Sequence, residues 1–323
     1  MRDEASALPT PRLLHHPDGI TAVDTEYLYP GHAAAHIVRH GGRAAFVDVG
    51  TNHSVPYLLA ALGALGLRPE AVDYVLLTHV HLDHAGGAGA LMRALPNAVC
   101  VLHPRGAPHM IDPTRLTAGS RAVYGPERFE RLYGRIEPIA AERVHVTHDG
   151  ERVSLAGREF EVLHTPGHAL HHQVFVDAAH RCMFTGDTFG ISYRELDSPA
   201  GAFITPTTTP TQFDPAQMRA SIERLLGYAP EAMYLMHYSR VTGVPRLGDS
   251  LLQQLQELER IARANAGAAD RPGAIQAAMW HLWRDLAHRH GCPVSEARLA
   301  ELLAGDLELN TQGLVHWLDT RAA

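Results

Sequence analysis

Four side chains of the kinds that bind metal ions stand within six consecutive positions. They are His79, His81, Asp83 and His84, in the run T-H-V-H-L-D-H that begins at residue 78. In an extended turn His79 and His81 project in the same direction, because side chains along a strand alternate with a period of two. Asp83 and His84 follow at the start of a helix and can face a second point. This arrangement suits two metal ions side by side rather than one.

Three later segments carry further ligand types, each at the end of an expected strand. They are H-T-P-G-H at 164–168, F-T-G-D-T at 184–188 and L-M-H-Y at 235–238, and they contribute His168, Asp187 and His237. Loops at the ends of strands on a rigid sheet are where active sites are commonly assembled. Together with the first four side chains, these three complete a set of seven candidate metal ligands.

The elements that must position these residues begin with strands and helices in alternation. Stretches rich in β-forming residues predict strands over 20–29, 34–39 and 43–49. A continuous apolar run over 72–78 predicts a buried strand directly before the first four ligands. Helices are expected over 55–67 and 85–95, another strand over 98–102, and two helices inside 113–134.

A second strand-rich stretch carries the remaining ligands. Strands are predicted over 143–146, 152–155, 159–164, 173–177, 182–185 and 232–236. Asp214 followed by Pro215 is a typical start for a helix, here running to about residue 226. Two strand-rich halves flanked by helices indicate two sheets packed face to face, with helices outside.

One segment of the second half has no clear periodicity. Residues 190–212 follow Asp187 directly and include the run Thr207-Thr208-Thr209. Long irregular segments in compact domains are usually functional or disordered. We therefore expect this segment to act as a flexible wall of the substrate pocket.

No strand is predicted after about residue 249, and the pattern of the remaining residues predicts helices. We predict a catalytic domain over 1–248 and a helical extension over 249–323. Apolar positions keep one face near 251–262 and near 275–286, and two shorter helices are expected in 295–304 and 311–319. Since the ligand set is complete by His237, the extension is expected to supply no ligand. It would cover the main domain or form the interface of a homodimer.

Composition excludes several function classes. The 28 basic residues are all arginine, against 35 Asp+Glu, so the formal charge is −7. Without lysine the chain has no Schiff-base nucleophile and no phosphate-loop lysine. An acidic chain also argues against a nucleic-acid or anionic-membrane partner. A small-molecule substrate is the partner we expect.

The cysteines and the N-terminal residues indicate a reducing compartment. The three cysteines, Cys100, Cys182 and Cys292, are odd in number and far apart. The first residues lack the positive start and apolar stretch of a signal peptide. The longest apolar run, over 55–67, is interrupted by Pro56 and two glycines and is too short to span a bilayer. These features predict a cytoplasmic protein.

The seven-ligand set resembles the metallo-β-lactamase-fold superfamily. T-H-V-H-L-D-H matches its central H-x-H-x-D-H motif, and H-T-P-G-H, G-D-T and the late histidine match its remaining motifs in order. The resemblance implies an α+β fold, a four-layer αβ/βα sandwich, over roughly residues 20–240. It also implies two metal ions: His79, His81 and His168 on the first, Asp83, His84 and His237 on the second, and Asp187 bridging both.

Within the superfamily, the sequence leans toward the glyoxalase II-like hydrolases and their uncharacterised relatives. Antibiotic-degrading members often have a cysteine at the second-metal position or a lysine that reaches the drug carboxylate. Here the matching positions offer Asp187, and no lysine is present. Glyoxalase II binds glutathione largely with basic side chains, lysines among them, so the absence of lysine argues against this exact substrate. His171 and His172 lie either behind the ligands or at the pocket rim.

The chemistry that the resemblance implies is hydrolysis by a metal-bridging hydroxide. Water bound to zinc-like ions loses a proton at a pH of about 7, so a nucleophile forms without a separate strong base. Asp83 or Asp187 can take or steer the proton, which makes both catalytic candidates. Small thioesters, esters and lactones suit this arrangement best. Zinc is the expected metal, with iron and manganese as alternatives.

Three other hypotheses concern the same candidate ligands. An iron-dependent persulfide dioxygenase of the same fold would use His79, His168 and Asp187 around one iron. A flavodiiron-type oxidoreductase carries an acidic residue where His81 stands and needs a flavin domain, so we set it aside. A binding or regulatory protein could retain the metals with little catalysis.

Overall fold

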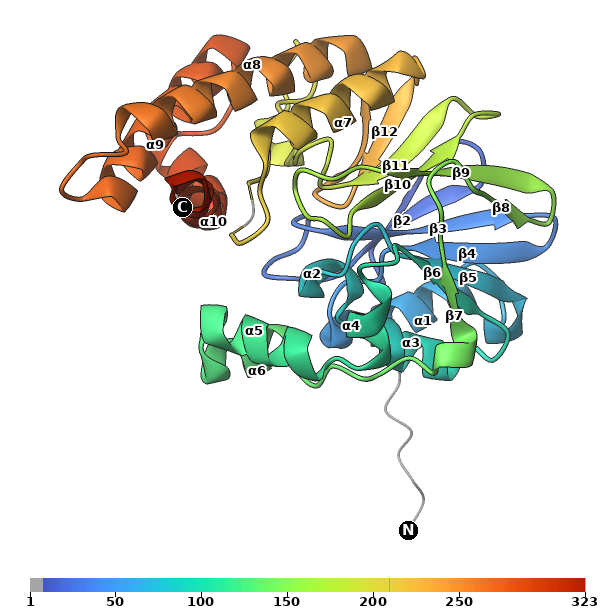
Figure 1. Ribbon diagram of the computed structural model, residues 1–323. Helices are drawn as coiled ribbons and strands as arrows, with labels where there is room; N and C mark the ends of the chain where they lie inside the picture. The colour runs from blue at the N-terminus through green and yellow to red at the C-terminus, as the bar shows by residue number, and fades with distance from the viewer. Residues whose placement is uncertain (1–7, 209, 323) are drawn as a thin grey trace. The chain divides into compact units, whose positions relative to one another are not determined.

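The computed structural model describes residues 8–208 and 210–322. The chain divides into two compact units, Met1–Val162 (unit 1) and Leu163–Ala323 (unit 2). Figure 1 shows the order of the elements along the chain, from blue strands to the red C-terminal helix. No helix of the described residues is both long and apolar enough to cross a membrane.

Unit 1 is built on a seven-stranded sheet in which the strand order follows the chain order. Its strands are β1 (Leu13–His15), β2 (Ile20–Asp24), β3 (Ala34–His40), β4 (Arg43–Val47), β5 (Val72–Leu76), β6 (Val99–Leu102) and β7 (Val144–Val146). The first four strands pair antiparallel, and β4 to β7 pair parallel. The parallel strands β4, β5 and β6 therefore end at the same edge, and this edge positions the first ligand motif.

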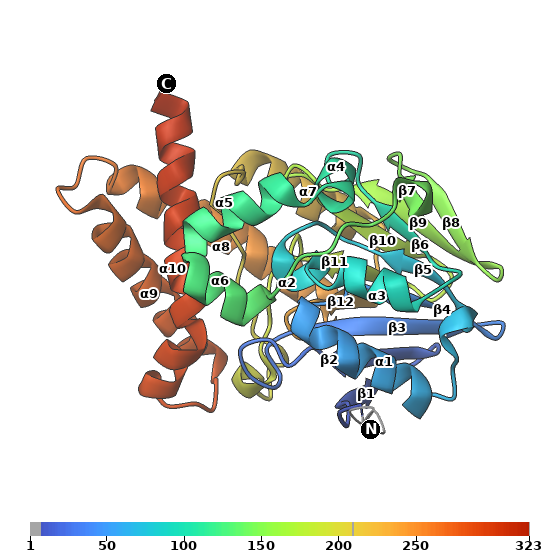
Figure 2. The same cartoon turned by 90° about the horizontal axis from the view of Figure 1, so that it is seen from below.

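Helices of unit 1 cover one face of this sheet. α1 (Val55–Ala64) and α3 (Ala88–Ala94) lie against it, and Figure 2 shows them side by side. Leu58, Leu62 and Leu91 are fully buried with Phe46 of β4 in one apolar core. Burial of apolar area of this kind is the main favourable term in folding. The core thus fixes the edge on which the ligands stand.

Three further helices of unit 1 form an insert after β6: α4 (Ala107–Ile111), α5 (Thr114–Tyr124) and α6 (Pro126–Tyr133). A fourth, the short α2 (Leu82–Ala85), lies inside the ligand motif. The two helices predicted inside 113–134 are confirmed, whereas α4 was not predicted. Tyr133 and Phe129 of α6 pack with Leu82 in a second apolar cluster, so the insert is anchored beside the ligand motif.

The second sheet has the order β13-β12-β11-β10-β9-β8. Its strands are β8 (Arg152–Leu155), β9 (Arg158–His164), β10 (Gln173–Asp177), β11 (Cys182–Gly186), β12 (Ala232–Leu235) and β13 (Ser239–Thr242). β9 runs across the boundary between the units. In unit 2, β11 and β12 pair parallel, and β12 and β13 pair antiparallel. β11 and β12 thus bring Asp187 and His237, which follow them, to one edge.

Among the described residues, four helices complete unit 2, and four single turns of 3-10 helix lie between the other elements. The helices are α7 (Pro215–Gly227), α8 (Val244–Ala264), α9 (Arg271–His290) and α10 (Glu296–Ala322). The 3-10 turns are η1 (Asn52–Ser54), η2 (Pro69–Ala71), η3 (Ala141–Arg143) and η4 (Arg194–Leu196). The Asp214 carboxylate accepts from the Gln217 backbone N–H, as predicted for the start of α7. α7 and α8 lie together over β11 and β12 (Figure 1).

The C-terminal helices agree with the prediction in α8 and differ from it in α10. The predicted face of α8, Leu251, Leu255, Leu258 and Ala262, is fully buried. Two short helices in 295–304 and 311–319 were predicted, but α10 is one continuous helix. Its middle section is held by contacts with the segment before α7, described below, and such contacts override local helix propensity. The boundary between domains at 248 and 249 stays a prediction.

Burial of His36 in β3 makes the stability of unit 1 depend on pH. Desolvation, with a smaller contribution from the charge of His16, lowers the pKa of His36 to about 3, against about 6.5 in an unfolded chain. The unfolded state therefore binds the proton first, and stability that is present above pH ~6.5 is lost as the pH falls toward 3. When the pH is lowered from 7 to 5, the unfolding free energy of the wild-type protein should fall. We expect the fall to be about 2 kcal/mol smaller in His36→Gln. Urea titrations at the two pH values measure this, and equal losses would refute it.

Candidate metal centre

The first four ligands occupy the turn after β5, at the edge where the parallel strands end. His79 and His84 are buried, and His81 and Asp83 are half-buried. The side-chain rings of His79 and His81 meet edge to face, with His79 Nε2 2.8 Å from His81 Nδ1. The ring of His79 also lies 4.0 Å from that of His84, measured between centroids. We call these four residues the unit 1 cluster.

A buried carboxylate behind the unit 1 cluster fixes its orientation. Asp48 follows β4 at the same edge, and its Oδ2 lies 2.9 Å from His84 Nδ1. The same carboxylate accepts from the backbone N–H of Thr78 at 2.9 Å and from the Thr78 hydroxyl at 2.8 Å. A carboxylate on one imidazole nitrogen sets the tautomer and directs the other nitrogen outward, which is the usual support for a metal-binding histidine. His84 is therefore set to offer Nε2.

The turn can form only because glycine follows the cluster. Gly87 donates its N–H to the Gly50 carbonyl at 3.0 Å. A Cβ atom at Gly87 would lie 2.5 Å from the Thr51 carbonyl oxygen, so the two loops approach more closely than a side chain permits. This contact places the loop that carries Asp48 directly against the ligand motif.

In unit 2, His168, Asp187 and His237 each follow a strand, as predicted; we call them the unit 2 cluster. His168 stands in the turn after β9, Asp187 after β11 and His237 after β12, and all three are buried. The turn before His168 needs glycine, since a Cβ at Gly167 would lie 2.2 Å from the Met218 backbone nitrogen. Loop residues from three strands thus converge at one edge of unit 2.

The Asp187 carboxylate lies between the two histidines of the unit 2 cluster. Its Oδ2 is 3.4 Å from His168 Nε2, and its Oδ1 is 4.0 Å from His237 Nε2. Two ligand atoms that each bind one zinc ion at 2.0–2.1 Å with tetrahedral geometry lie about 3.4 Å apart. Each carboxylate oxygen therefore faces a different histidine; the separation to His168 equals this value, and the separation to His237 is longer. The donor set, imidazole nitrogens and carboxylate oxygens, also fits zinc and similar divalent metals.

Further residues hold this cluster from behind. Thr207 Oγ1 lies 2.6 Å from His168 Nδ1. His172 is fully buried, and its Nε2 accepts from the Asp187 backbone N–H at 3.2 Å. The Ser192 N–H donates to the His237 carbonyl at 2.6 Å. Of the two histidines whose place the sequence left open, His172 lies behind a candidate ligand.

The segment after Asp187 is packed rather than loose. The flexible wall predicted over 190–212 is mostly buried up to residue 208, and Ile191 and Thr205 exchange two backbone hydrogen bonds. Gln254 of α8 donates to the Ile204 carbonyl at 2.8 Å. Its aromatic residues Tyr193 and Phe203 are buried as well. Thr209, the last residue of the predicted threonine run, lies outside the described residues.

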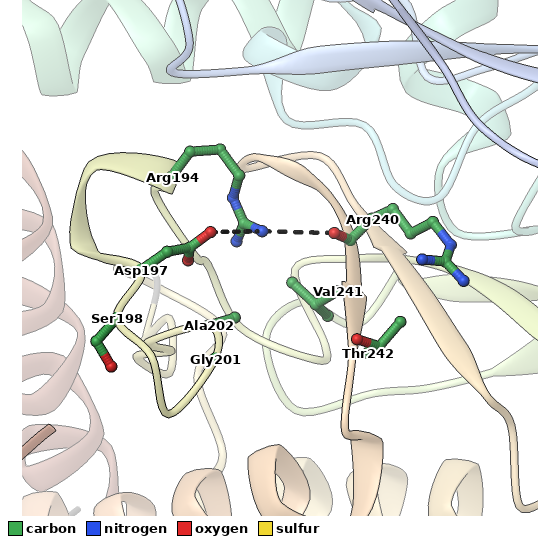
Figure 3. A pocket seen from close by; sticks show the side chains of 8 residues that line it. All are labelled: Arg194, Asp197, Ser198, Gly201, Ala202, Arg240, Val241 and Thr242. Atoms are coloured by element: carbon green, nitrogen blue, oxygen red, sulfur yellow. Dashed lines mark hydrogen bonds and ion pairs between the residues drawn. The ribbon is translucent and has the colours of Figure 1, made fainter.

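Part of this segment lines a pocket of about 240 Å³ beside β13. Figure 3 shows Arg194 and Asp197 on one side of it and Arg240, Val241 and Thr242 on the other. The Arg194 guanidinium lies 3.3 Å from Asp197 Oδ2 and donates to the Arg240 carbonyl at 3.4 Å. Burial lowers the pKa of Arg194 and raises the pKa of Asp197. Charged and polar side chains thus line the pocket, and its lining residues on β13 start with Arg240, three residues after His237.

Sequence reasoning missed two residues behind the clusters. One feature of the sequence could have indicated Asp48: it is a carboxylate near the end of a predicted strand, followed by Val49 and Gly50. Thr207 belongs to the threonine run in the expected pocket wall, but nothing in that run indicates a contact with His168. Both act through contacts with residues far along the chain, which spacing does not reveal.

We expect the three cysteines to react slowly with alkylating reagents. Cys100 and Cys182 are buried, and burial, together with the nearby Asp197 charge, raises the pKa of Cys292 to about 11. At pH 8 a thiol with such a pKa is ionised in about one molecule in a thousand. Native protein at pH 8 should therefore take up iodoacetamide far more slowly than urea-unfolded protein, as followed by intact mass. Rapid, stoichiometric labelling of the native chain would contradict this.

Comparison with known proteins gives one family match. A model of the family described as the metallo-beta-lactamase superfamily matches residues 28–237. Over 202 residues the chain is 28% identical to a hydroxyacylglutathione hydrolase of Aeromonas hydrophila, covering 62% of this chain and 59% of that protein. It is 32% identical over 203 residues to one of Xanthomonas euvesicatoria, again covering 59% of the relative. The chain therefore spans less than two thirds of the length of these relatives.

Solved structures share the fold over nearly the whole chain. A metallo-beta-lactamase superfamily protein of Sulfolobus tokodaii superposes with a TM-score of 0.65 at 20% identity, covering 93% of this chain and 99% of that one. A metallo-beta-lactamase family protein of Thermus thermophilus gives 0.67 at 20% identity, covering 94% of each. Such coverage exceeds what residues 1–248 alone could supply, so it includes C-terminal helices. The predicted α+β sandwich with a helical extension is confirmed.

Proposed function

Since this chain belongs to the metallo-β-lactamase superfamily, its family model covering residues 28–237, we propose that it is a metal-dependent hydrolase of a small thioester, ester or lactone. The observation that carries the proposal is the Asp187 carboxylate, whose two oxygens each face a different buried histidine. A carboxylate in that position is suited to bridging two ions. The fixed orientation of His84 and His168 adds to this, because both present a directed nitrogen.

The proposed ligand assignment, for two divalent ions, is the one that the family resemblance implies. His79, His81 and His168 would bind one ion, Asp83, His84 and His237 the other, and Asp187 both. When bound, such ions supply a hydroxide nucleophile near neutral pH and polarise the substrate carbonyl. Zinc is the first candidate, and iron and manganese are the alternatives.

The protein's own residues then have separate tasks. Asp48 keeps His84 in one tautomer, and Thr207 does the same for His168. Asp83 is half-buried and is the carboxylate of the unit 1 cluster that solvent can reach, so it is suited to accepting or delivering a proton during turnover. Asp187 is the second candidate for that step.

The substrate class follows from the relatives and from charge. Hydroxyacylglutathione hydrolases, which the chain resembles at 28–32% identity, support a thioester substrate. The net charge of −7 and the absence of lysine argue against a nucleic-acid phosphodiester. The cytoplasmic location and the homodimer stay predictions.

A substrate panel on defined metal forms tests the proposal. The full chain is stripped with a chelator, reloaded with zinc, iron or manganese, and assayed on small thioesters, lactones, carboxylic esters and phosphodiesters. We expect a thioester, carboxylic ester or lactone to be turned over, and only by the reloaded protein. Turnover of phosphodiesters alone, or no hydrolysis by any metal form, would overturn the proposal.

A further inference from the structure

The C-terminal helix α10 reaches the segment that supports a candidate ligand. Asn310, in the middle of α10, accepts the Thr208 backbone N–H on its side-chain Oδ1. The Thr208 hydroxyl in turn donates to the Asn310 carbonyl at 2.9 Å. Asn310 and Thr208 are both buried, so these two bonds are shielded from water. They fix the backbone of Thr208 to the helix.

The residue next to Thr208 touches the unit 2 cluster directly. The Thr207 hydroxyl donates to the Asp187 carbonyl at 3.3 Å and lies 2.6 Å from His168 Nδ1. A hydroxyl has one hydrogen, so with that hydrogen on Asp187 it must accept from His168 Nδ1–H. This leaves the Nε2 lone pair of a neutral imidazole as the ligand atom. The backbone position of Thr207 therefore sets the direction of His168.

Asn310 is itself held in place on α10. Its side-chain amide donates to the Asp306 carbonyl at 2.7 Å, one helical turn earlier. The Asp306 carboxylate accepts from the Tyr193 hydroxyl at 3.0 Å, a third bond between α10 and the same segment. These hydrogen bonds, from Asn310 to Thr208 and from Asp306 to Tyr193, join α10 to both ends of the segment that follows Asp187.

We propose that Asn310 is a positioning residue for the metal centre, acting through Thr208 and Thr207 on His168. The inference rests on the proposed function, in which His168 binds a metal ion. It gives the helical extension a task at the site, although the extension supplies no ligand. Loss of the Asn310–Thr208 hydrogen bonds should weaken metal binding while leaving the fold intact.

Metal affinity tests this directly. The full chain is stripped, and cobalt(II) and zinc affinities are measured by competition with a chromophoric chelator, with the visible spectrum of the cobalt form as a second readout. Thr207→Val keeps the shape without the hydroxyl, and we expect about 10-fold to 100-fold weaker binding and an altered cobalt spectrum. Asn310→Leu is expected to weaken binding about fivefold. Thr207→Ser, which restores the hydroxyl, should recover most of the affinity.

Thr311→Val is the matched control, because Thr311 is the next residue of α10 and its hydroxyl donates within the helix to the Leu307 carbonyl at 2.6 Å. It should bind metal as wild type does. Should Asn310→Leu fail to fold, Thr208→Val removes only the hydroxyl bond to Asn310 and is expected to weaken binding about twofold to threefold. A folded Asn310→Leu variant with wild-type affinity and cobalt spectrum would overturn this inference but not the proposed function; if Asn310→Leu does not fold, the same result for Thr208→Val would overturn it. A wild-type chain that binds no metal would overturn the proposed function with it.

Discussion

Replacing Asp187 by alanine is expected to remove both metal ions and to abolish hydrolysis. The two carboxylate oxygens face His168 and His237 separately, so one substitution takes a ligand from each ion. Metal ions contribute several kcal/mol of transition-state stabilisation, and their loss corresponds to a fall in kcat/KM of about a thousandfold or more. Metal content by mass spectrometry and kcat/KM on the best substrate measure the two effects.

Two variants serve as controls for this result. His237→Ala removes a ligand of one ion only, so we expect it to lose mainly the second metal. Asp249→Ala removes an exposed carboxylate of α8 and should retain both metals. If Asp187→Ala kept two tightly bound ions per chain, the bridging role would be wrong.

Replacing Asp48 by asparagine is expected to weaken both metal binding and the fold. The buried carboxylate accepts the backbone N–H and hydroxyl of Thr78 and contacts His84 Nδ1. An amide in its place offers a donor where an acceptor is required. Loss of a supporting contact of this kind costs about 10-fold to 100-fold in metal affinity. The buried bonds lost should also lower the unfolding free energy by about 1–3 kcal/mol.

Asp73→Asn is the matched control for Asp48→Asn. Asp73 lies on β5 and pairs with Arg43 near the surface, where a salt bridge contributes about 0–1 kcal/mol. It should leave metal affinity unchanged. Denaturant titration and chelator competition on both variants make the comparison. Equal stability and equal affinity in the two would show that Asp48 does not support the ligands.

The ligands were predictable because they are close in sequence or end apolar strands. His79 to His84 form one short motif, and His168, Asp187 and His237 each follow a strand that its residues already indicate. The supporting residues were not, because their partners are distant. Asp48 and His84 are 36 residues apart, Thr207 and His168 are 39 apart, and Asn310 and Thr208 are 102 apart. No local pattern encodes a single contact over such separations.

The error in α10 has the same origin. Gly305, Asp306 and Asn310 are poor helix formers, and they predict a break between two short helices. In the folded chain Asp306 and Asn310 bind Tyr193 and Thr208, and these bonds stabilise the helix where its own propensity is weak. The residues that would be expected to end a helix are thus the ones that attach it to the segment beside the metal centre.

The number and kind of metal ions per chain test the central claim most directly. The measurement is elemental analysis of the full chain after purification without chelators, with protein concentration from quantitative amino-acid analysis. We predict about two divalent ions per chain, with zinc, iron or manganese filling both positions. About one iron per chain, with oxygen uptake on addition of a persulfide, would contradict the hydrolase and favour the dioxygenase of the same fold.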